Sequence, residues 1–488
     1  MSDTSLPLTV KFPHRSRRGI LLGLSLPQLL LTSAALALLM VTVVSTGLTG
    51  ALVLAPLWAG VAALVVVRRR GRSLIDWAPI VLRHAQRRRT GQTLWLARPI
   101  SRPHRDGTLH LPGTSASLHV VTPDGSRAAA VHDPHRRTLT AVARLSSRAF
   151  ALLDPATQAA HVTGWGRALA SISRTGNIAA IQVLERTVPD SGDTLTRHWN
   201  QHGRPGTPVA GQVYADLVAA AGPAAAPHEA YLAISLDLRA ARRLISQAGG
   251  GLPGAFTVLE QTTASVTQAV RSAGLTVTGW LTATEIAAVI RTAYDPKTAP
   301  RLQQWSPQSG RPEAASAAAG PVVQVEHADR VITDTARHAT YWIENWPRTE
   351  TSPGFLHGLM FSAGVRRTLS LIYVPQHLDA ALRDVQRTKA SIIADASERR
   401  RRGMVDSEAD SVEYADAKTR ERQLIAGHAD VELTGLLTVS AETDALLDAA
   451  CAQIETAAGS AQVDLRRLDY QQPDALTTAA LPLARITL

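Results

Sequence analysis

Residues 21–67 read LLGLSLPQLLLTSAALALLMVTVVSTGLTGALVLAPLWAGVAALVVV. This run contains no charged residue, and a polar, Gly-rich stretch at Ser45–Gly50 divides it into two apolar parts. A helix needs about 20 apolar residues to cross the hydrocarbon core of a bilayer, so the first part is long enough and Leu52–Val67 is slightly short. We therefore expect a two-helix transmembrane hairpin at residues 21–67.

Basic residues flank this hairpin on both sides. They are Lys11, Arg15, Arg17 and Arg18 before it, and Arg68, Arg69, Arg70 and Arg72 after it. The positive-inside rule places both flanks in the cytoplasm, so residues 1–20 form a cytosolic basic tail and the turn faces outward. A signal peptide also begins with basic and then apolar residues, but here there is no convincing small-residue cleavage site and a second apolar run follows at once. We expect a protein of the cell membrane with both termini cytoplasmic.

The composition suits a cytosolic body after the hairpin. The chain has 488 residues and one cysteine, Cys451, which excludes an intramolecular disulfide framework and supplies no metal-ligand cluster. Cys451 lies in an Ala-rich helical pattern and is expected to be a small core residue. We expect neither a cofactor nor a metal.

The connector at residues 68–99 has the pattern of a helix that lies on the cytoplasmic leaflet. Apolar residues recur at helical spacing from Leu74 to Ala85, and arginines occupy the other faces. The residues expected to contact anionic lipid headgroups are Arg68, Arg69, Arg70, Arg72, Trp77, Arg83, Arg87, Arg88 and Arg89. A solvated basic connector is the alternative. No direct nucleic-acid binding is expected despite the net charge of +11, because aromatic residues are only 4% of the chain and do not alternate with the basic ones.

Beyond the connector, the chain is long enough for two α/β domains. A stretch rich in proline and alanine at residues 296–320 breaks the periodicity and is the expected linker between residues 100–295 and residues 321–488. In the first domain we expect strands at Ser117–Thr122, Arg127–Val131, Leu139–Leu145, Ile178–Val188, Tyr231–Leu238 and Val277–Leu281, and a helix at Pro155–Arg174.

The second domain repeats this alternation. We expect strands at Ala339–Ile343, Thr368–Val374, Val431–Val439 and Val463–Leu468, a long polar helix from His377 towards Ala426 with an interruption at Gly403, and a helix at Glu442–Ala457. Strands that alternate with helices indicate an α/β or α+β body, and the order of the elements predicts ferredoxin-like halves.

Motifs for catalysis are missing from the sequence. Neither GxxxxGK[ST] nor GxSxG occurs, so we expect neither a P-loop nor a nucleophile elbow. Gly249, Gly251 and Gly254 fit GxGxxG, but a helical pattern precedes them where a dinucleotide site needs a strand. They are interpreted as a linker between two helices, and no catalytic residue is assigned.

Two polar clusters each have a functional and a plainer interpretation. His132, Asp133 and His135 follow a strand, and such a cluster is more often an exposed turn than a metal site. The second cluster lies on the long helix and consists of Arg399, Arg400, Arg401 and Arg402. It is either a docking surface for an acidic partner or a solvated helix face.

Several short sequences resemble a known family. They are Phe12–His14, Arg17–Gly23, Thr93–Pro99, Val188–Gly192, Ala293–Pro296 and Leu371–Pro375. With the hairpin, they resemble the actinobacterial integral membrane protein family of conjugative, type IV secretion-like loci over nearly the whole chain. In that family, a PrgI-like membrane hairpin precedes a cytosolic domain similar to the N-terminal part of the conjugation ATPase.

The resemblance implies a scaffold without a motor. Tyr470–Gln472 and Leu481–Leu483 resemble the sequence at which the ATPase enters its motor, whereas this chain ends at Leu488. Asp474–Thr478 departs from the aromatic and Gly-rich end of the family's tail. The implied function is therefore a non-catalytic protein that anchors or docks a separate secretion ATPase, in a hetero-oligomeric complex with other membrane subunits.

Two alternatives remain open. EccE, a component of type VII secretion, is similar in plan, with two N-terminal helices, an Arg-rich connector and an α/β body, although the ATPase-like tail argues against it. A membrane-tethered enzyme is the other alternative, because an α/β body can host a site without any short motif.

Overall fold

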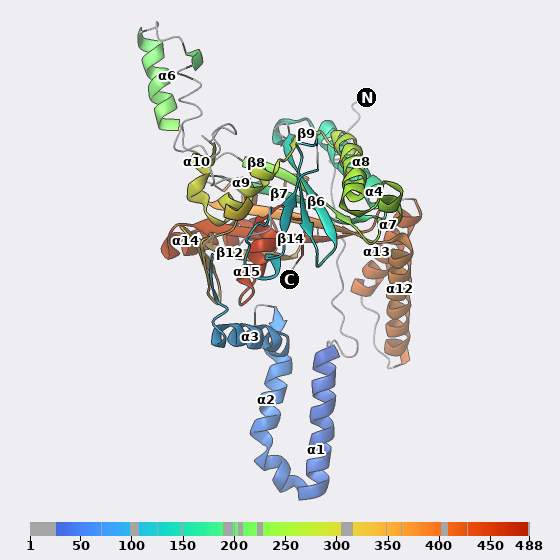
Figure 1. Cartoon of the computed structure of the whole chain (residues 1–488). Helices are drawn as coiled ribbons and strands as arrows, with labels where there is room; N and C mark the ends of the chain where they lie inside the picture. Colours follow the sequence, from blue (N-terminus) through green and yellow to red (C-terminus); the bar gives the residue numbers. More distant parts are fainter. Residues whose placement is uncertain are drawn as a thin grey trace. The chain divides into compact units, whose positions relative to one another are not determined.

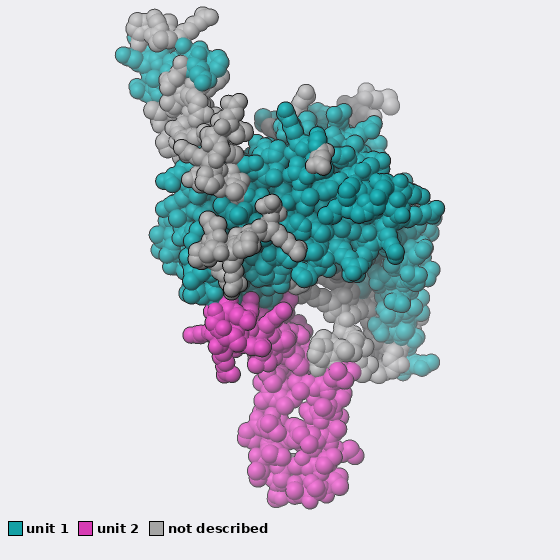
Figure 2. Space-filling model, viewed as in Figure 1, with its two compact units in different colours: residues 1–12, 94–488 teal, residues 13–93 magenta. Residues whose placement is uncertain are grey.

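A computed structural model describes residues 26–69, 71–97, 107–123, 125–147, 150–188, 199, 201–203, 208–221, 228–303, 316–347, 349–362, 364–401, 408–426 and 428–486. The described residues divide into two compact units, one within residues 13–93 and the other within residues 94–488 (Figure 2). The boundary between the two units falls inside the connector expected at residues 68–99.

The smaller unit contains two apolar helices, α1 at Leu26–Val53 and α2 at Ala55–Val66. Gly47 interrupts α1 with a φ of 68°, a backbone conformation that glycine adopts without steric cost. This break lies inside the polar stretch between the two apolar runs. Near the start of α1, the Nε2 of Gln28 donates to the carbonyl of Val65 near the end of α2, at 3.4 Å. The two helices therefore run antiparallel, side by side (Figure 1).

The length of α1 supports membrane association. Its segment Gln28–Gly47 has 20 residues and is long and apolar enough to cross a bilayer. In contrast, α2 has 12 residues, or about 18 Å at 1.5 Å per residue, which is less than the roughly 30 Å of the hydrocarbon core. The second span therefore stays a prediction. The unit continues with β1 (Arg68–Arg69), β2 (Arg72–Ser73) and α3 (Leu74–Arg89).

The larger unit is built on one sheet. Its strands are β3 (Leu94–Leu96), β4 (His119–Val121), β5 (Ala130–Asp133), β6 (Thr138–Ser147), β7 (Ile178–Thr187), β8 (His228–Asp237), β9 (Leu275–Trp280), β10 (Val323–Glu326), β11 (Val331–Thr333), β12 (Ala336–Asn345), β13 (Arg366–Pro375), β14 (Val431–Ala441) and β15 (Asp464–Arg467). Each strand expected from the sequence is present, although β5 begins later than expected. The mixed α/β class is therefore confirmed.

The helices of the larger unit include those predicted at Pro155–Arg174, from His377 towards Ala426 and at Glu442–Ala457. They are α4 (Pro155–Ser173), α6 (Pro208–Ala221), α7 (Arg242–Gln247), α8 (Gly251–Arg271), α9 (Ala283–Tyr294), α10 (Ala299–Gln303), α11 (His357–Met360), α12 (Leu378–Arg401), α13 (Glu408–Ile425), α14 (Asp444–Ser460) and α15 (Gln472–Ala480). Local signals fix their starts: Asp154 caps α4 by accepting from the Thr157 amide at 2.9 Å, and Thr282 and Glu285 form a capping box on α9. Of the GxGxxG glycines, Gly249 lies between α7 and α8, and Gly251 and Gly254 lie in the first turn of α8, so a helix precedes them as expected.

The strands pair antiparallel in the order β3-β10-β11-β12-β14-β13-β7-β8-β6-β5-β4, with β9 also beside β6 and β15 beside β12. The first part of the chain contributes β9-β6-β8-β7, and the second contributes β13-β14-β12-β15. They meet where β7 pairs with β13, from Arg186 opposite Thr368 to Ile181 opposite Tyr373. The two predicted domains, divided at residues 296–320, thus share one sheet and one compact unit.

Side chains along β13 alternate between the two faces of this sheet, and different helices cover each face. Leu369, Leu371 and Tyr373 face the layer that contains α4, α8 and α14, whereas Ile372 faces the layer that contains α9 and α15. Cys451 on α14 is buried in the first of these layers, as expected for a small core residue.

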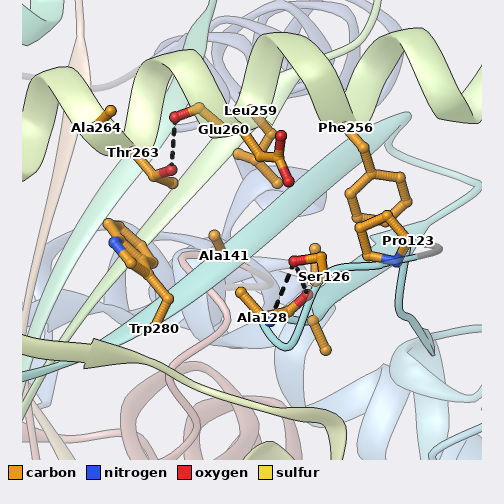
Figure 3. A pocket seen from close by; sticks show the side chains of 12 residues that line it. Pro123, Ser126, Ala128, Ala141, Phe256, Leu259, Glu260, Thr263, Ala264 and Trp280 are labelled. Atoms are coloured by element: carbon orange, nitrogen blue, oxygen red, sulfur yellow. Dashed lines mark hydrogen bonds between the residues drawn. The ribbon is translucent and has the colours of Figure 1, made fainter.

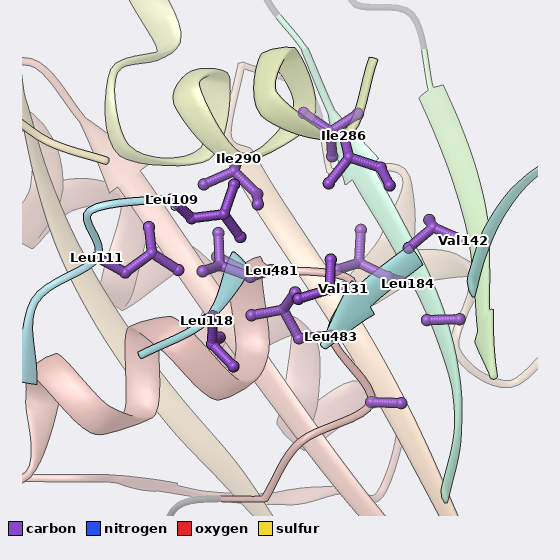
Figure 4. Close-up of a cluster of buried hydrophobic side chains, with 14 of the residues drawn as sticks. Leu109, Leu111, Leu118, Val131, Val142, Leu184, Ile286, Ile290, Leu481 and Leu483 are labelled. Carbon is purple, nitrogen blue, oxygen red and sulfur yellow. The ribbon is translucent and has the colours of Figure 1, made fainter. Parts of the chain in front are cut away.

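The core beneath α9 and α15 draws on distant parts of the chain. Figure 4 shows Ile290 of α9 beside Leu109, and Leu481 of the C-terminal segment between Leu109 and Leu118. Ile286 of α9 and Leu483 of the C-terminal segment belong to the same core. All six side chains are at most 4% exposed. The C-terminal segment that follows α15 therefore belongs to the core of the larger unit.

Gln182 on β7 holds this segment at the junction of the two halves. Its side chain is fully buried, and its Nε2 donates to Ser370 Oγ on β13 at 2.7 Å and to the Leu481 carbonyl at 3.0 Å. Its Oε1 accepts from the Ala484 amide at 2.6 Å. One amide thus connects β7, β13 and the C-terminal segment.

We expect Gln182→Leu to lower the free energy of unfolding by about 2–4 kcal/mol, because it leaves a buried hydroxyl, carbonyl and amide without their partner. Urea unfolding of the purified full chain, followed by tryptophan fluorescence, measures this loss. Gln268→Leu, on the exposed side of α8, is the control and should change the midpoint little. A Gln182→Leu midpoint equal to that of the control would contradict the assigned role.

Candidate functional site

The basic helix α3 is the candidate membrane-contacting site, and its ends match the helix dipole. Ser73 precedes the helix, and its Oγ donates to Asp76 Oδ2 in the first turn at 2.6 Å. Arg87, Arg88 and Arg89 lie in the last turn. A carboxylate near the N-terminus and cations near the C-terminus both stabilise a helix. The sequence therefore forms the expected helix despite the internal proline at position 79.

Exposure along α3 differs from the sequence prediction at its aromatic residue. Trp77 is only 7% exposed, so its ring lies in the protein interior and not on the surface. Leu82, at 68% exposed, and Val81, at 39%, are instead the large apolar side chains on the outer surface. Sequence periodicity identified the helix but could not show that Trp77 faces other protein atoms.

The arginines predicted to contact lipid differ in how far they are exposed. Arg68, Arg83, Arg88 and Arg89 are exposed, Arg72 and Arg87 are half-buried, and Arg70 and the side chain of Arg69 lie outside the described residues. Exposed cations beside exposed Val81 and Leu82 form a surface of mixed charge and apolar character. Such a surface suits the boundary between headgroups and acyl chains.

The predicted docking residues lie at the far end of α12. Arg401 is exposed at the end of the helix, the side chains of Arg399 and Arg400 lie outside the described residues, and so does Arg402. Helices α12 and α13 pack together as an arm inserted between β13 and β14, with a small core at Ala381, Val385 and Leu424. An acidic partner for this arm stays a prediction.

Ion pairs tie the arm together and to the sheet. Lys389 Nζ lies 2.8 Å from Glu421 Oε2, which joins α12 to α13. Arg420 on α13 contacts Asp384 on α12 at 3.1 Å and Asp430 just before β14 at 2.5 Å. Because these pairs are partly exposed, each contributes modestly to stability, but together they fix the direction of the arm.

The His132–Asp133–His135 cluster has a structural role. Asp133 is buried and pairs with Arg485 of the C-terminal segment, with 2.9 Å between its Oδ2 and the guanidinium Nε. Its other oxygen accepts from the His135 amide at 3.0 Å. The described residues hold no group of three or more His, Cys, Asp or Glu side chains that could bind a metal. Asp133 therefore closes the turn and anchors the C-terminal segment.

A buried ionic network lies under α9. The Arg186 guanidinium contacts Glu229 Oε2 at 2.7 Å, and it also donates to Thr292 Oγ1 and the Val289 carbonyl, each at 2.9 Å. Burial opposes the charge of Glu229, but the Arg186 guanidinium keeps its pKa below the usual value. Because Arg186 on β7 bonds to two residues of α9, this network positions α9 on the sheet.

His338 is the most strongly perturbed histidine among the groups with a described shift. It is fully buried on β12, and burial lowers its pKa from 6.5 to about 4. Thr333 Oγ1 donates to the Tyr294 carbonyl at 2.5 Å, so its only proton is used there. The His338 Nε2, 2.8 Å from this hydroxyl, must then carry the ring proton, and Nδ1 accepts from Ser440 at 2.8 Å. The neutral ring thus links β11, β12, β14 and α9.

No family model matches the chain, and a comparison with curated proteins finds no match.

We expect the arginines of α3 to supply most of its affinity for anionic lipid. In a synthetic peptide of residues 72–93, replacing Arg83, Arg88 and Arg89 by alanine should weaken partitioning into phosphatidylglycerol vesicles roughly 100-fold, at about 1 kcal/mol for each cation. Trp77 fluorescence in a vesicle titration measures this. Neutral phosphatidylcholine vesicles are the control, and equal binding of both peptides to the anionic vesicles would contradict the interpretation.

Stability should fall as the pH drops from 6.5 towards 4. An unfolded chain binds a proton at His338 near pH 6.5, whereas the folded protein binds it only near pH 4, so acid favours unfolding in this window. At pH 5 the loss is about 2 kcal/mol. Urea unfolding at pH 7.5 and pH 5 measures it, and His338→Gln should reduce the pH dependence by this amount. An unchanged pH dependence in that variant would disprove the assignment.

Proposed function

We propose that this chain is a non-catalytic membrane scaffold of a conjugative, type IV-like secretion or DNA-transfer machine, which docks a separate ATPase at the cell membrane. The observation that carries the proposal is the order of the parts. An apolar helix long enough to span a bilayer precedes the exposed basic and apolar surface of α3, and a large sheet body with surface insertions follows. This order suits a protein that holds partners next to a membrane.

We extend the proposal to two spans with both termini cytoplasmic. The contact between Gln28 and Val65 supports it, because a chain that returns along α1 brings its two basic flanks to the same end of the helix pair. In this arrangement Arg68 and Arg72 mark the cytoplasmic boundary after α2. Local thinning of the bilayer and snorkelling of these arginines would compensate for the short α2.

Each half of the sheet is proposed to be a ferredoxin-like unit. In chain order the halves are β6-α4-β7-β8-α8-β9 and β12-α11-β13-β14-α14-β15, with strand orders β9-β6-β8-β7 and β15-β12-β14-β13. Both orders suit the split βαβ arrangement of that fold. Both halves carry an insertion at the same place, α6 between β7 and β8, and α12–α13 between β13 and β14.

Of these two insertions, the α12–α13 arm is the proposed docking element. The α12–α13 arm combines internal ion pairs with the run of arginines from Arg399 to Arg402, which would attract an acidic surface of the ATPase. Helices cover both faces of this sheet, so a scaffold with this fold needs binding elements outside its core. The proposal assigns no reaction, cofactor or metal to the body.

Affinity purification of the full chain from native membranes in mild detergent, with mass spectrometry, tests the function. We expect a conjugation-type ATPase at high yield, and its loss when residues 386–420 are replaced by a Gly-Ser linker. Replacing residues 189–227 in the same way is the matched control for an insertion of similar size. Removing residues 1–72 should release a soluble, folded fragment.

The other outcomes are equally informative. A type VII ATPase in the eluate would favour the EccE-like alternative, and a clean monomer would favour the membrane-tethered enzyme. If the fragment without residues 1–72 stayed with membranes in high salt, the assignment of the anchor would be wrong.

A further inference from the structure

A cavity lies between α8 and the sheet, beside the loop that joins β4 to β5. It encloses about 280 Å³. Two small side chains, Ala130 and Ala141, lie opposite each other where β5 and β6 pair and line its floor. Phe256 and Trp280 line its two ends, and Figure 3 shows them on either side of the space beneath α8. The small side chains of this floor leave room for the cavity.

Apart from one carboxylate, the polar side chains that line the cavity already make hydrogen bonds within the protein. Ser126 Oγ is used on the Ala128 backbone, at 3.2 Å from the amide and 3.3 Å from the carbonyl. Thr263 Oγ1 donates to the Glu260 carbonyl at 2.9 Å within α8. The Glu260 side chain is exposed at the rim and has no ion-pair partner among the described residues. Recognition here therefore rests on shape, apolar contact and one negative charge.

These features limit what can occupy the cavity. A nucleotide or another phosphorylated ligand would bring its negative charge to Glu260, and the lining residues that the structure describes include no cation. Sites for small molecules enclose roughly 300–1,000 Å³ and present several convergent polar groups. At about 280 Å³ the cavity is at the lower limit of this range, and it presents one such group. A binding pocket for a single large side chain of a partner protein needs neither a larger volume nor several polar groups.

We propose that this cavity is a docking pocket for a polypeptide segment that presents a bulky apolar side chain next to a lysine or arginine. The apolar side chain enters between Phe256 and Trp280 above the alanine floor, and the neighbouring cation pairs with Glu260. Trp280 is already fixed for this contact, because its Nε1 donates to Thr267 Oγ1 at 3.3 Å. This inference deepens the proposed docking function and rests on it for a protein partner.

Disulfide tethering on the purified full chain tests the pocket directly. Ser126→Cys places a thiol at the rim, and the native chain has only Cys451, which is buried. The probes are three acetylated tripeptide amides, Cys-Phe-Lys, Cys-Phe-Glu and Cys-Gly-Lys, allowed to exchange under mild reducing conditions. Intact-mass spectrometry gives the labelled fraction.

We expect Cys-Phe-Lys to label best, about two- to fivefold better than Cys-Phe-Glu, as for an exposed ion pair. It should exceed Cys-Gly-Lys by about tenfold because of the buried ring. Adding Glu260→Gln should remove the preference for lysine over glutamate, and adding Ala264→Leu, which fills the pocket from an exposed helix position, should remove the preference for phenylalanine. Gln268→Leu on the same helix should leave both preferences unchanged.

Equal labelling by the three peptides, or preferences that survive Ala264→Leu, would overturn the proposal. A thiol-bearing phenethylamine that labels more strongly than every peptide would assign the pocket to a free amine and also overturn it. If Ser126→Cys does not fold, Ala128→Cys places the thiol at the same rim. Tethering uses the isolated protein, so it can fail while the ATPase still copurifies, or succeed when no ATPase does.

Discussion

The antiparallel pairing of β7 with β13 is the constraint on which the larger unit depends. Without it, the two halves would be separate sheets with exposed edges at their centre. The Gln182 amide strengthens this junction, because it joins β7 to Ser370 on β13 and to the C-terminal segment. That segment also contributes Leu481 and Leu483 to the core beneath α9, where they share one cluster with Leu109.

This arrangement decides which surfaces are available to partners. Helices α4, α8 and α14 cover one face of the sheet, and α9 and α15 cover the other. A partner therefore cannot add a layer without displacing a helix. The elements left are the insertions, α6 and α12–α13, and local defects in packing. The alanine-floored pocket under α8 is such a defect, since tight packing elsewhere in that layer leaves little room for a side chain from outside.

The sequence predicts local elements well because their signals are local. Strands such as β13 follow from β-branched and apolar runs ended by Pro375, and α4 follows from the helical pattern of Pro155–Arg174. Contacts between distant residues could not be predicted in this way. The bond between Gln182 and Ala484 joins positions 302 residues apart, and no periodicity carries that information. Trp77 fits an interfacial pattern equally well whether its ring faces lipid or protein, so only its 7% exposure decides its place.

The C-terminal segment links the architecture to the proposed function. Gln472, within the sequence that resembles the approach to an ATPase motor, is fully buried, and its side chain bonds to both the amide and the carbonyl of Thr340 on β12. Arg485 is anchored on Asp133, a residue of β5 in the other half. Residues from Gln472 to Arg485 thus contribute to the core that joins the two halves. Because the C-terminal segment is held in this core, we expect an ATPase to bind to surface elements such as the α12–α13 arm and not to the C-terminal segment.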